Sequence, residues 1–228
     1  MTDFHSCGFT LAPVELTREQ CDYLIASIPA VTSGRGGVRG LLAHPAVIKI
    51  LSHAQFGEYL WSVVGRELVA VKATLFDKTA DSNWRSQWHQ DRVIAVRDRM
   101  AVNGYGPWSM KLGVAHVEPP SQVLEQMIAV RIHLDECGAD NGPLQVISGS
   151  HALGKLGDDA IQRRVSAAKA VEIRVPKGGI VLMRPLLVHA STPARVPSHR
   201  RVLHIEFAPA ESISPLQWHS AVTLRRAA

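Results

Sequence analysis

The first third of the chain carries apolar residues at the spacing of amphipathic helices. The segment Thr17–Gln20 (TREQ) is a capping-box pattern, in which the hydroxyl and the amide satisfy free backbone N–H groups. Apolar side chains follow three and four residues apart, which predicts a helix over residues 17–28 that ends before Pro29. A second helical pattern covers residues 44–64, and residues 32–40 form a predicted glycine-rich loop.

From residue 67 the apolar positions alternate with a period of two, which is typical of β-strands. The predicted strands cover residues 68–76, 93–96, 127–134, 170–175, 179–187 and 201–207. Helices followed by many short strands predict a β-sandwich or jelly roll with the helices packed on one outer face. Residues 98–126 show no clear periodicity, and we expect a long, lid-like insertion that is either functional or mobile.

Length and composition indicate one globular domain. The 228 residues are 46% apolar with a mean hydropathy of +0.03. We expect a single domain over residues 1–228, with a helical N-terminal part (1–66), a β core (67–208) and the insertion (98–126). The sequence has no bilayer-length apolar run and no N-terminal signal pattern, and its three cysteines lack metal or redox spacing. These features predict a cytoplasmic protein without a membrane partner.

The net charge of +5 is modest, and the basic residues are scattered along the chain. The sequence contains no basic stripe with interleaved aromatic residues, so we expect no nucleic-acid partner. The excess of basic residues favours a small anionic or zwitterionic substrate. The sequence makes no prediction about the oligomeric state.

A histidine and an aspartate two residues apart form the first candidate metal site. Alternation along a strand places His89 and Asp91 on one face, so that both side chains can reach one metal ion. The pair alone is weak support, because His133 and Asp135 have the same spacing and a polar strand face explains either pair equally well.

A third ligand is expected late in the chain. An Fe(II) site that also binds a co-substrate and dioxygen needs three protein ligands on one face. His189 meets this need, because it ends the apolar strand predicted up to Val188. A turn then returns the chain so that Arg200 lies beside His189, where its guanidinium can bind the far carboxylate of a dicarboxylic co-substrate. The hydroxyl of Ser191 can bind the same carboxylate.

Three groups of residues, in order along the chain, resemble the phytanoyl-CoA dioxygenase family, which includes ectoine hydroxylase. They are the segment 76–91 with its His-Gln-Asp, the segment 140–151 (DNGPLQVISGSH), and the segment 189–201 that begins His-Ala-Ser. The resemblance implies a double-stranded β-helix, a cupin-like relative of the jelly roll. It also implies an oxygenase that uses Fe(II), 2-oxoglutarate and O2, hydroxylates an unactivated C–H bond, and releases succinate and CO2.

By the same resemblance, His89, Asp91 and His189 take the iron positions and Arg200 takes the 2-oxoglutarate position. Arg201 is the rival for that position, but alternation along the last strand turns Arg200 inward and Arg201 outward. The competing class of function is a non-catalytic, metal-binding jelly roll that binds a ligand without turnover. A structural zinc site is disfavoured, because no cysteine lies near the three ligands in the sequence.

Three further residues are candidates for substrate binding. Arg131 shares a strand face with His133 and Asp135, and this face lines the barrel or meets solvent. Lys78 stands where the family often has a basic residue, with a surface position as the alternative. Trp88 precedes the first histidine of the motif and completes the set.

Overall fold

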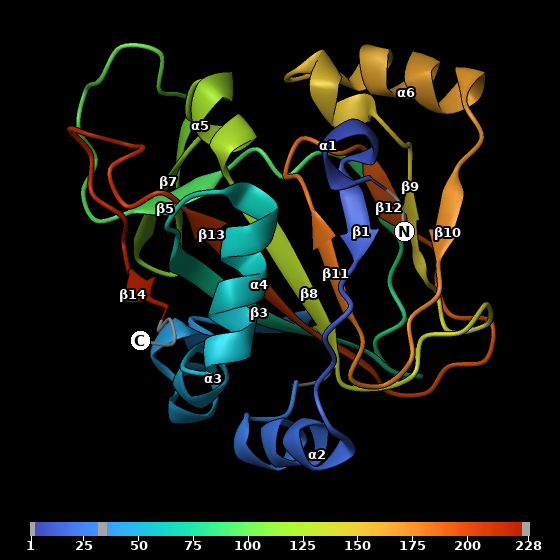
Figure 1. Ribbon diagram of the computed structural model, residues 1–228. Coiled ribbons are helices and arrows are strands. Elements are labelled where there is room, and N and C mark those ends of the chain that lie inside the picture. The colour runs from blue at the N-terminus through green and yellow to red at the C-terminus, as the bar shows by residue number, and fades with distance from the viewer. Residues whose placement is uncertain (1–2, 32–35, 225–228) are drawn as a thin grey trace.

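Two antiparallel β-sheets that pack face to face form the centre of the computed structural model, which describes residues 3–31 and 36–224 (Figure 1). The larger sheet has the order β1 (Phe9–Leu11), β11 (Ile180–Met183), β8 (Ile128–His133), β13 (Arg200–Ala208), β3 (Val69–Lys78) and β14 (Val222–Thr223), and β2 (Gly37–Arg39) pairs with β3. The smaller sheet has the order β10 (Val171–Ile173), β9 (Leu144–Val146), β12 (His189–Ser191) and β4 (Ser86–His89). This arrangement confirms the predicted double-stranded β-helix.

Helices cover the outer face of the larger sheet, whereas α6 lies across one end of the smaller sheet (Figure 1). The helical segments are α1 (Phe4–Cys7), α2 (Arg18–Ser27), η1 (Leu41–Ala43), α3 (Pro45–Leu51), α4 (Ala54–Val64), α5 (Ser121–Gln126), η2 (Ser150–Leu153) and α6 (Asp158–Ala167). Helices α2 to α4 share a core with the outer side chains of the larger sheet, where the Phe207 and Phe56 ring centroids lie 6.0 Å apart. Within the described residues, the structure has no helix with the length and apolar character needed to span a membrane.

The first predicted helix is confirmed, whereas the second is wrong as a single element. In α2 the Thr17 hydroxyl accepts from the Gln20 N–H at 3.2 Å, and the Gln20 amide oxygen accepts from the Thr17 N–H at 2.8 Å. The second pattern divides into α3 and α4, because the Ser52 hydroxyl ends α3 by donating to the Ile48 carbonyl at 2.8 Å and His53 has an extended backbone.

Two predictions for loops need correction. Of the glycine-rich loop, residues 32–35 lie outside the described residues, and Gly37–Arg39 forms β2 rather than a loop. The insertion 98–126 contains β6 (Trp108–Lys111), β7 (Val114–Val117) and α5, and with β5 (Ile94–Val96) it forms a sheet of order β5-β7-β6. Its strands are only three or four residues long, too short for alternation to show. Leu112, at the hairpin tip, is 78% exposed with φ of +51°.

The predicted strand 179–187 is also wrong in its second half. Strand β11 ends at Met183, and the Leu187 N–H donates to the Arg184 carbonyl at 3.0 Å in a turn that contains Pro185. Proline lacks the N–H that a continued ladder needs, so the chain leaves the larger sheet here and enters the smaller sheet as β12. His189 is therefore the first residue of a new strand rather than the end of an old one.

Candidate active site

A cavity of about 310 Å³ opens between the two sheets and contains the residues of the predicted metal site. The residues that line the cavity are Arg39, Lys72, Thr74, Phe76, Trp84, Ser86, His89, Gln90, Asp91, Arg92, Val93, Lys111, His116, Arg131, Leu144, His189, Ala190, Ser191, Arg200, His204 and Glu206. Most come from β3, β4, β12 and β13, so the pocket occupies the polar half of the space between the sheets. The other half is filled by an apolar cluster that includes Phe9, Val146 and Met183.

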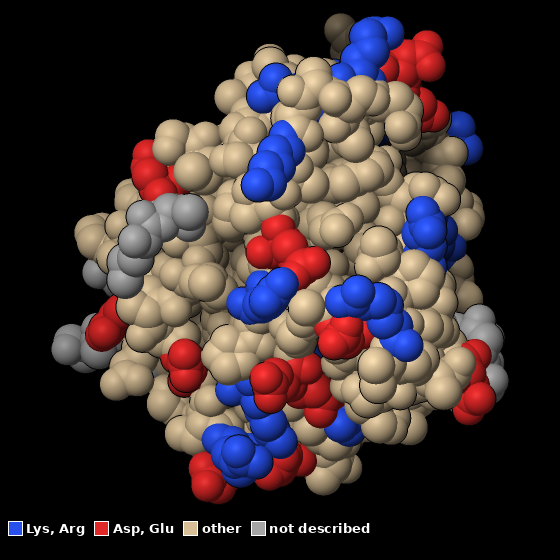
Figure 2. All heavy atoms as spheres, turned by 90° about the vertical axis from the view of Figure 1, so that its right-hand side faces the viewer, with Lys and Arg blue, Asp and Glu red and all other residues tan. Residues whose placement is uncertain are grey.

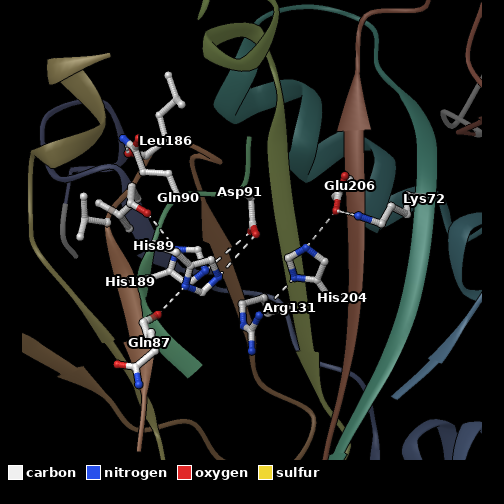
Figure 3. Close-up of polar contacts among 12 residues, drawn as sticks. Lys72, Gln87, His89, Gln90, Asp91, Arg131, Leu186, His189, His204 and Glu206 are labelled. Atoms are coloured by element: carbon white, nitrogen blue, oxygen red, sulfur yellow. Dashed lines mark hydrogen bonds and ion pairs between the residues drawn. The ribbon is translucent and has the colours of Figure 1, made fainter. Parts of the chain in front are cut away.

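His89, Asp91 and His189 lie together, with one ligand atom of each within 4.8 Å of the others. The two histidines are cross-strand partners of β4 and β12, and their ring centroids lie 4.2 Å apart. Asp91 follows the end of β4 rather than sharing the strand with His89, and its N–H donates to the Pro185 carbonyl at 2.9 Å. The carboxylate oxygens lie 3.8 Å from His89 Nε2 and 3.7 Å from His189 Nε2 (Figure 3).

This geometry fits a single metal ion. Ion–ligand bonds to imidazole nitrogen and carboxylate oxygen are about 2.0–2.2 Å long, so two atoms on one ion are at most about 4.4 Å apart, and both histidine–aspartate distances lie within this limit. Both histidines direct Nδ1 at a backbone carbonyl two residues earlier, at 2.6 Å for His89 and 2.8 Å for His189. A carbonyl only accepts, so Nδ1 carries the proton and Nε2 keeps its lone pair for the metal. Two imidazoles and one carboxylate form the donor set of a mononuclear ferrous site.

The electrostatic environment keeps both kinds of ligand in their metal-binding state. Burial alone raises the pKa of Asp91, but the imidazoles of His189, His204 and His89 and the Lys72 ammonium outweigh it, so the pKa lies well below its usual range. Burial lowers the pKa of His189 to about 4, although Asp91 acts in the opposite direction. At neutral pH the carboxylate is therefore ionised and the His189 imidazole is neutral.

Gln90, between the two ligands of the motif, is a site residue that sequence reasoning missed. Its amide is buried, donates to the Gly154 carbonyl at 2.8 Å and the Leu186 carbonyl at 2.7 Å, and accepts from the Leu156 N–H at 2.8 Å. The partners lie about 65 and 95 residues further along the chain, so no local pattern could have revealed this role.

Arg200 and Ser191 lie at one end of the cavity. Arg200 is 2% exposed and donates to the Gly142 carbonyl at 2.5 Å, while its Nε has no hydrogen-bond partner among the described residues. Lys78, the cross-strand partner of Arg200, donates to the Ser191 hydroxyl at 3.0 Å, which places both cavity residues at the same end. Burial, and then the Arg200 guanidinium, lowers the pKa of Lys78 to about 7.

Arg201 points to the other side of β13, as the alternation predicted. Its Nε and Nη2 each donate to Asp135, both at 2.8 Å, in a bidentate pair outside the cavity. Because Asp135 already accepts from both Nε and Nη2, this side of the Arg201 guanidinium cannot form a bidentate pair with the carboxylate of a ligand.

The remaining candidates have different positions. Arg131 and His133 are buried and face the interior between the two sheets. Asp135, by contrast, pairs with Arg201, so the predicted shared face of the three residues does not extend to Asp135. Lys78 is fully buried behind Ser191, which excludes the surface alternative and keeps it out of the cavity lining. Trp88 was predicted to bind substrate, but alternation along β4 turns it away from the cavity and against the core under α6.

A row of charged and polar side chains forms the wall across from the metal ligands (Figure 3). Lys72 Nζ donates to Glu206 Oε1 at 2.7 Å, and His204 Nε2 lies 3.6 Å from the same oxygen. Arg131 Nη1 donates to His204 Nδ1 at 3.2 Å. Lys72 was not predicted as a site residue, although the alternation of β3 gives it the same inward face as Thr74.

Comparison with proteins of known structure shows the same fold. EctD from S. alaskensis, solved with 2-oxoglutarate and 5-hydroxyectoine, matches 99% of this chain and 83% of its own, with 16% identity and a TM-score of 0.70. AviO1 from Streptomyces viridochromogenes Tue57 matches 91% of this chain and 92% of its own, with 22% identity and a TM-score of 0.65. The alpha-ketoglutarate dependent epimerase SnoN from nogalamycin biosynthesis matches 91% and 80%, with 14% identity and a TM-score of 0.64.

Among curated protein sequences, none matches the chain significantly. The sequence model described as phytanoyl-CoA dioxygenase (PhyH) matches residues 38–202, which is more than half of the chain and includes all three residues of the metal cluster. The chain therefore belongs to the phytanoyl-CoA dioxygenase family of iron- and 2-oxoglutarate-dependent oxygenases.

Proposed function

We propose that this enzyme hydroxylates an unactivated C–H bond of a small anionic or zwitterionic metabolite and converts 2-oxoglutarate to succinate and CO2. Family membership gives the reaction class. The observation that carries the proposal is the convergence of His89, Asp91 and His189 on one cavity that also contains Arg200. The Arg200 guanidinium is buried and forms no ion pair with a carboxylate among the described residues.

We assign His89, Asp91 and His189 as the iron ligands. Three protein ligands leave half of an octahedral coordination sphere for co-substrate and dioxygen. When bound, iron would activate O2 at the expense of 2-oxoglutarate, so that one oxygen atom goes to succinate and the other to the substrate. The chain's own part is to hold the ion on neutral imidazoles and an ionised carboxylate, and to orient both reactants beside it.

Arg200 and Ser191 are assigned to the 5-carboxylate of 2-oxoglutarate. A buried guanidinium whose Nε lacks a partner among the described residues is costly unless an anion binds to it. A carboxylate between Arg200 and the Ser191 hydroxyl would satisfy that nitrogen by a charge-assisted hydrogen bond. The hydrogen bonds of Arg200 go to neutral groups, namely the Gly142 carbonyl and the Cys137 thiol. Burial lowers the pKa of Arg200, and the Asp77 carboxylate acts in the opposite direction without forming an ion pair with Arg200 among the described residues.

The substrate is expected to bind at the side of the cavity that Lys72, Glu206, His116 and Lys111 line. These side chains are polar or charged, which favours a polar substrate over a lipid-like one. The cavity volume of about 310 Å³ is near the lower end of the roughly 300–1,000 Å³ of small-molecule sites, which favours a small substrate. Figure 2 shows basic and acidic side chains intermingled on one face of the molecule rather than gathered by sign.

The competing function is a metal-binding jelly roll without turnover. Anaerobic addition of Fe(II) and 2-oxoglutarate discriminates between the two, because a weak visible charge-transfer band appears only when both bind at one open site. We expect this band in the wild type and its loss in Asp91→Ala. A screen of metabolite pools for compounds that stimulate succinate release would then identify the substrate. Undiminished substrate-stimulated turnover in Asp91→Ala would refute the site assignment.

A further inference from the structure

A second buried arginine lines the same cavity. Arg131 is 7% exposed, and its Nε has no hydrogen-bond partner within the described part of the chain. Among the described residues, Arg131 forms no ion pair with a carboxylate, and His204 is the one side chain that it hydrogen-bonds. A buried cation without a carboxylate indicates a binding group for an anion.

The hydrogen-bond pattern fixes how Arg131 is held. A guanidinium only donates, so His204 Nδ1 is the acceptor and His204 carries its proton on Nε2, which faces Glu206. Lys72 donates to Glu206 from the other side. In Figure 3 the Arg131 guanidinium points away from this Lys72–Glu206 pair, and therefore away from the proposed substrate side.

Arg131 also lies at a different level of the larger sheet from Arg200. On β13 its cross-strand partner is His204, four residues beyond Arg200, which is about 13 Å along a strand. Burial and then the Arg200 guanidinium lower the pKa of Arg131, and the Asp91 carboxylate acts in the opposite direction. Arg131 is therefore near both Arg200 and the candidate metal ligand Asp91.

We propose that Arg131 binds the 1-carboxylate of 2-oxoglutarate, the end that chelates the metal, so that each carboxylate of the co-substrate has its own buried arginine. This inference rests on the proposed 2-oxoglutarate site. Arg131 orients the co-substrate from the larger sheet, and His204 positions Arg131 through the bond to Nδ1.

Binding of two co-substrate analogues tests the proposal without turnover. Protein loaded with Mn(II) under anaerobic conditions is titrated with 2-oxoglutarate and with 2-oxopentanoate, which keeps the chelating end but has a methyl group in place of the 5-carboxylate. In Arg131→Met both compounds should bind about 10-fold or more weakly, with their affinity ratio unchanged. In Arg200→Met only the affinity for 2-oxoglutarate should fall, so the two compounds should bind with similar affinity.

The controls separate binding from folding. Arg201→Met, outside the cavity, should leave both affinities unchanged. Arg131→Met leaves the buried His204 Nδ1 without its donor, so the melting temperature of the ligand-free variant is measured beside the affinities. If this variant folds poorly, Arg131→Gln, which keeps a donor for His204, carries the same test.

Each other outcome overturns the inference. Unchanged affinities in Arg131→Met would show that this arginine does not contact the co-substrate, and weakening of 2-oxoglutarate alone would place it at the far carboxylate. If the Mn(II)-loaded wild type does not bind 2-oxoglutarate, the proposed function itself fails. The two failures are therefore distinguishable.

Discussion

The Gln90 amide donates to the Leu186 carbonyl at 2.7 Å and so joins the two chain segments that carry the proposed metal ligands. Gln90 lies between His89 and Asp91, and Leu186 lies three residues before His189. The same amide also bonds the loop at Gly154 and Leu156. One buried side chain therefore connects both segments of the proposed metal site with the loop that follows η2.

Replacing Gln90 should weaken metal binding. Gln90→Glu keeps the size and the acceptor but removes both donors, and we expect about a 10- to 100-fold loss of Mn(II) affinity by titration calorimetry. Gln87→Glu is the matched control, because its side chain is exposed and only its backbone carbonyl contacts His89. Equal Mn(II) affinities in the two variants would show that the Gln90 contacts do not position the ligands.

Arg200 and Arg201 should differ in their effect on the co-substrate. A charge-assisted hydrogen bond contributes roughly 1.5–3 kcal/mol, so Arg200→Ala should raise the 2-oxoglutarate concentration at half-saturation about 10- to 150-fold. Arg201→Ala should leave it unchanged and lower the free energy of unfolding by about 1 kcal/mol through loss of the Asp135 pair. Saturation curves and urea unfolding of both variants measure these effects. The reverse pattern would reassign the guanidinium that binds 2-oxoglutarate.

Co-substrate affinity should depend on pH through Lys78. Its pKa of about 7 in the ligand-free protein means that the ammonium is present below pH 7 and is lost as the pH rises. A bound dianion favours the ammonium, so 2-oxoglutarate should bind progressively more weakly between pH 7 and pH 8.5, and this slope should be absent in Lys78→Met. An identical slope in both proteins would assign the titration to another group.

The same shift affects stability with the opposite sign. The folded pKa of Lys78 lies below the usual lysine value of 10.5, so the unfolded chain binds more protons between about pH 7 and pH 10.5. The Lys78 contribution to the free energy of unfolding of the ligand-free protein should therefore rise across this window. Comparing wild type with Lys78→Met by urea unfolding at several pH values measures it.

The hairpin tip between β6 and β7 offers a stabilising substitution. Leu112 has φ of +51°, a left-handed conformation that costs a residue with a Cβ about 1–2 kcal/mol but that asparagine tolerates better. Because the side chain is exposed, Leu112→Asn loses little packing and should raise the free energy of unfolding by up to about 1 kcal/mol. A decrease on thermal or urea unfolding would show that the leucine makes a stabilising contact.

The sequence predicted those parts of the fold and the site that depend on local pattern. Alternation along residues 200–207 correctly separated the inward Arg200 from the outward Arg201. It failed around Pro185, because β11 and the residues that lead into β12 form one continuous apolar run in the sequence although the two strands belong to different sheets. Lys72 and Gln90 were missed for another reason: their importance comes from partners distant in sequence.

The pairing of His89 with His189 has a consequence for the protein without its metal. Strand β4 is an edge strand, and within the described residues its one hydrogen-bonded neighbour is β12. An ion held by both histidines would cross-link the two strands at the open side of the smaller sheet. Without the ion, β4 is held to β12 by its backbone hydrogen bonds alone, and its separation would expose the edge of β12 to pairing with another molecule. Chelator-treated protein should therefore self-associate at a lower temperature than the metal-loaded form.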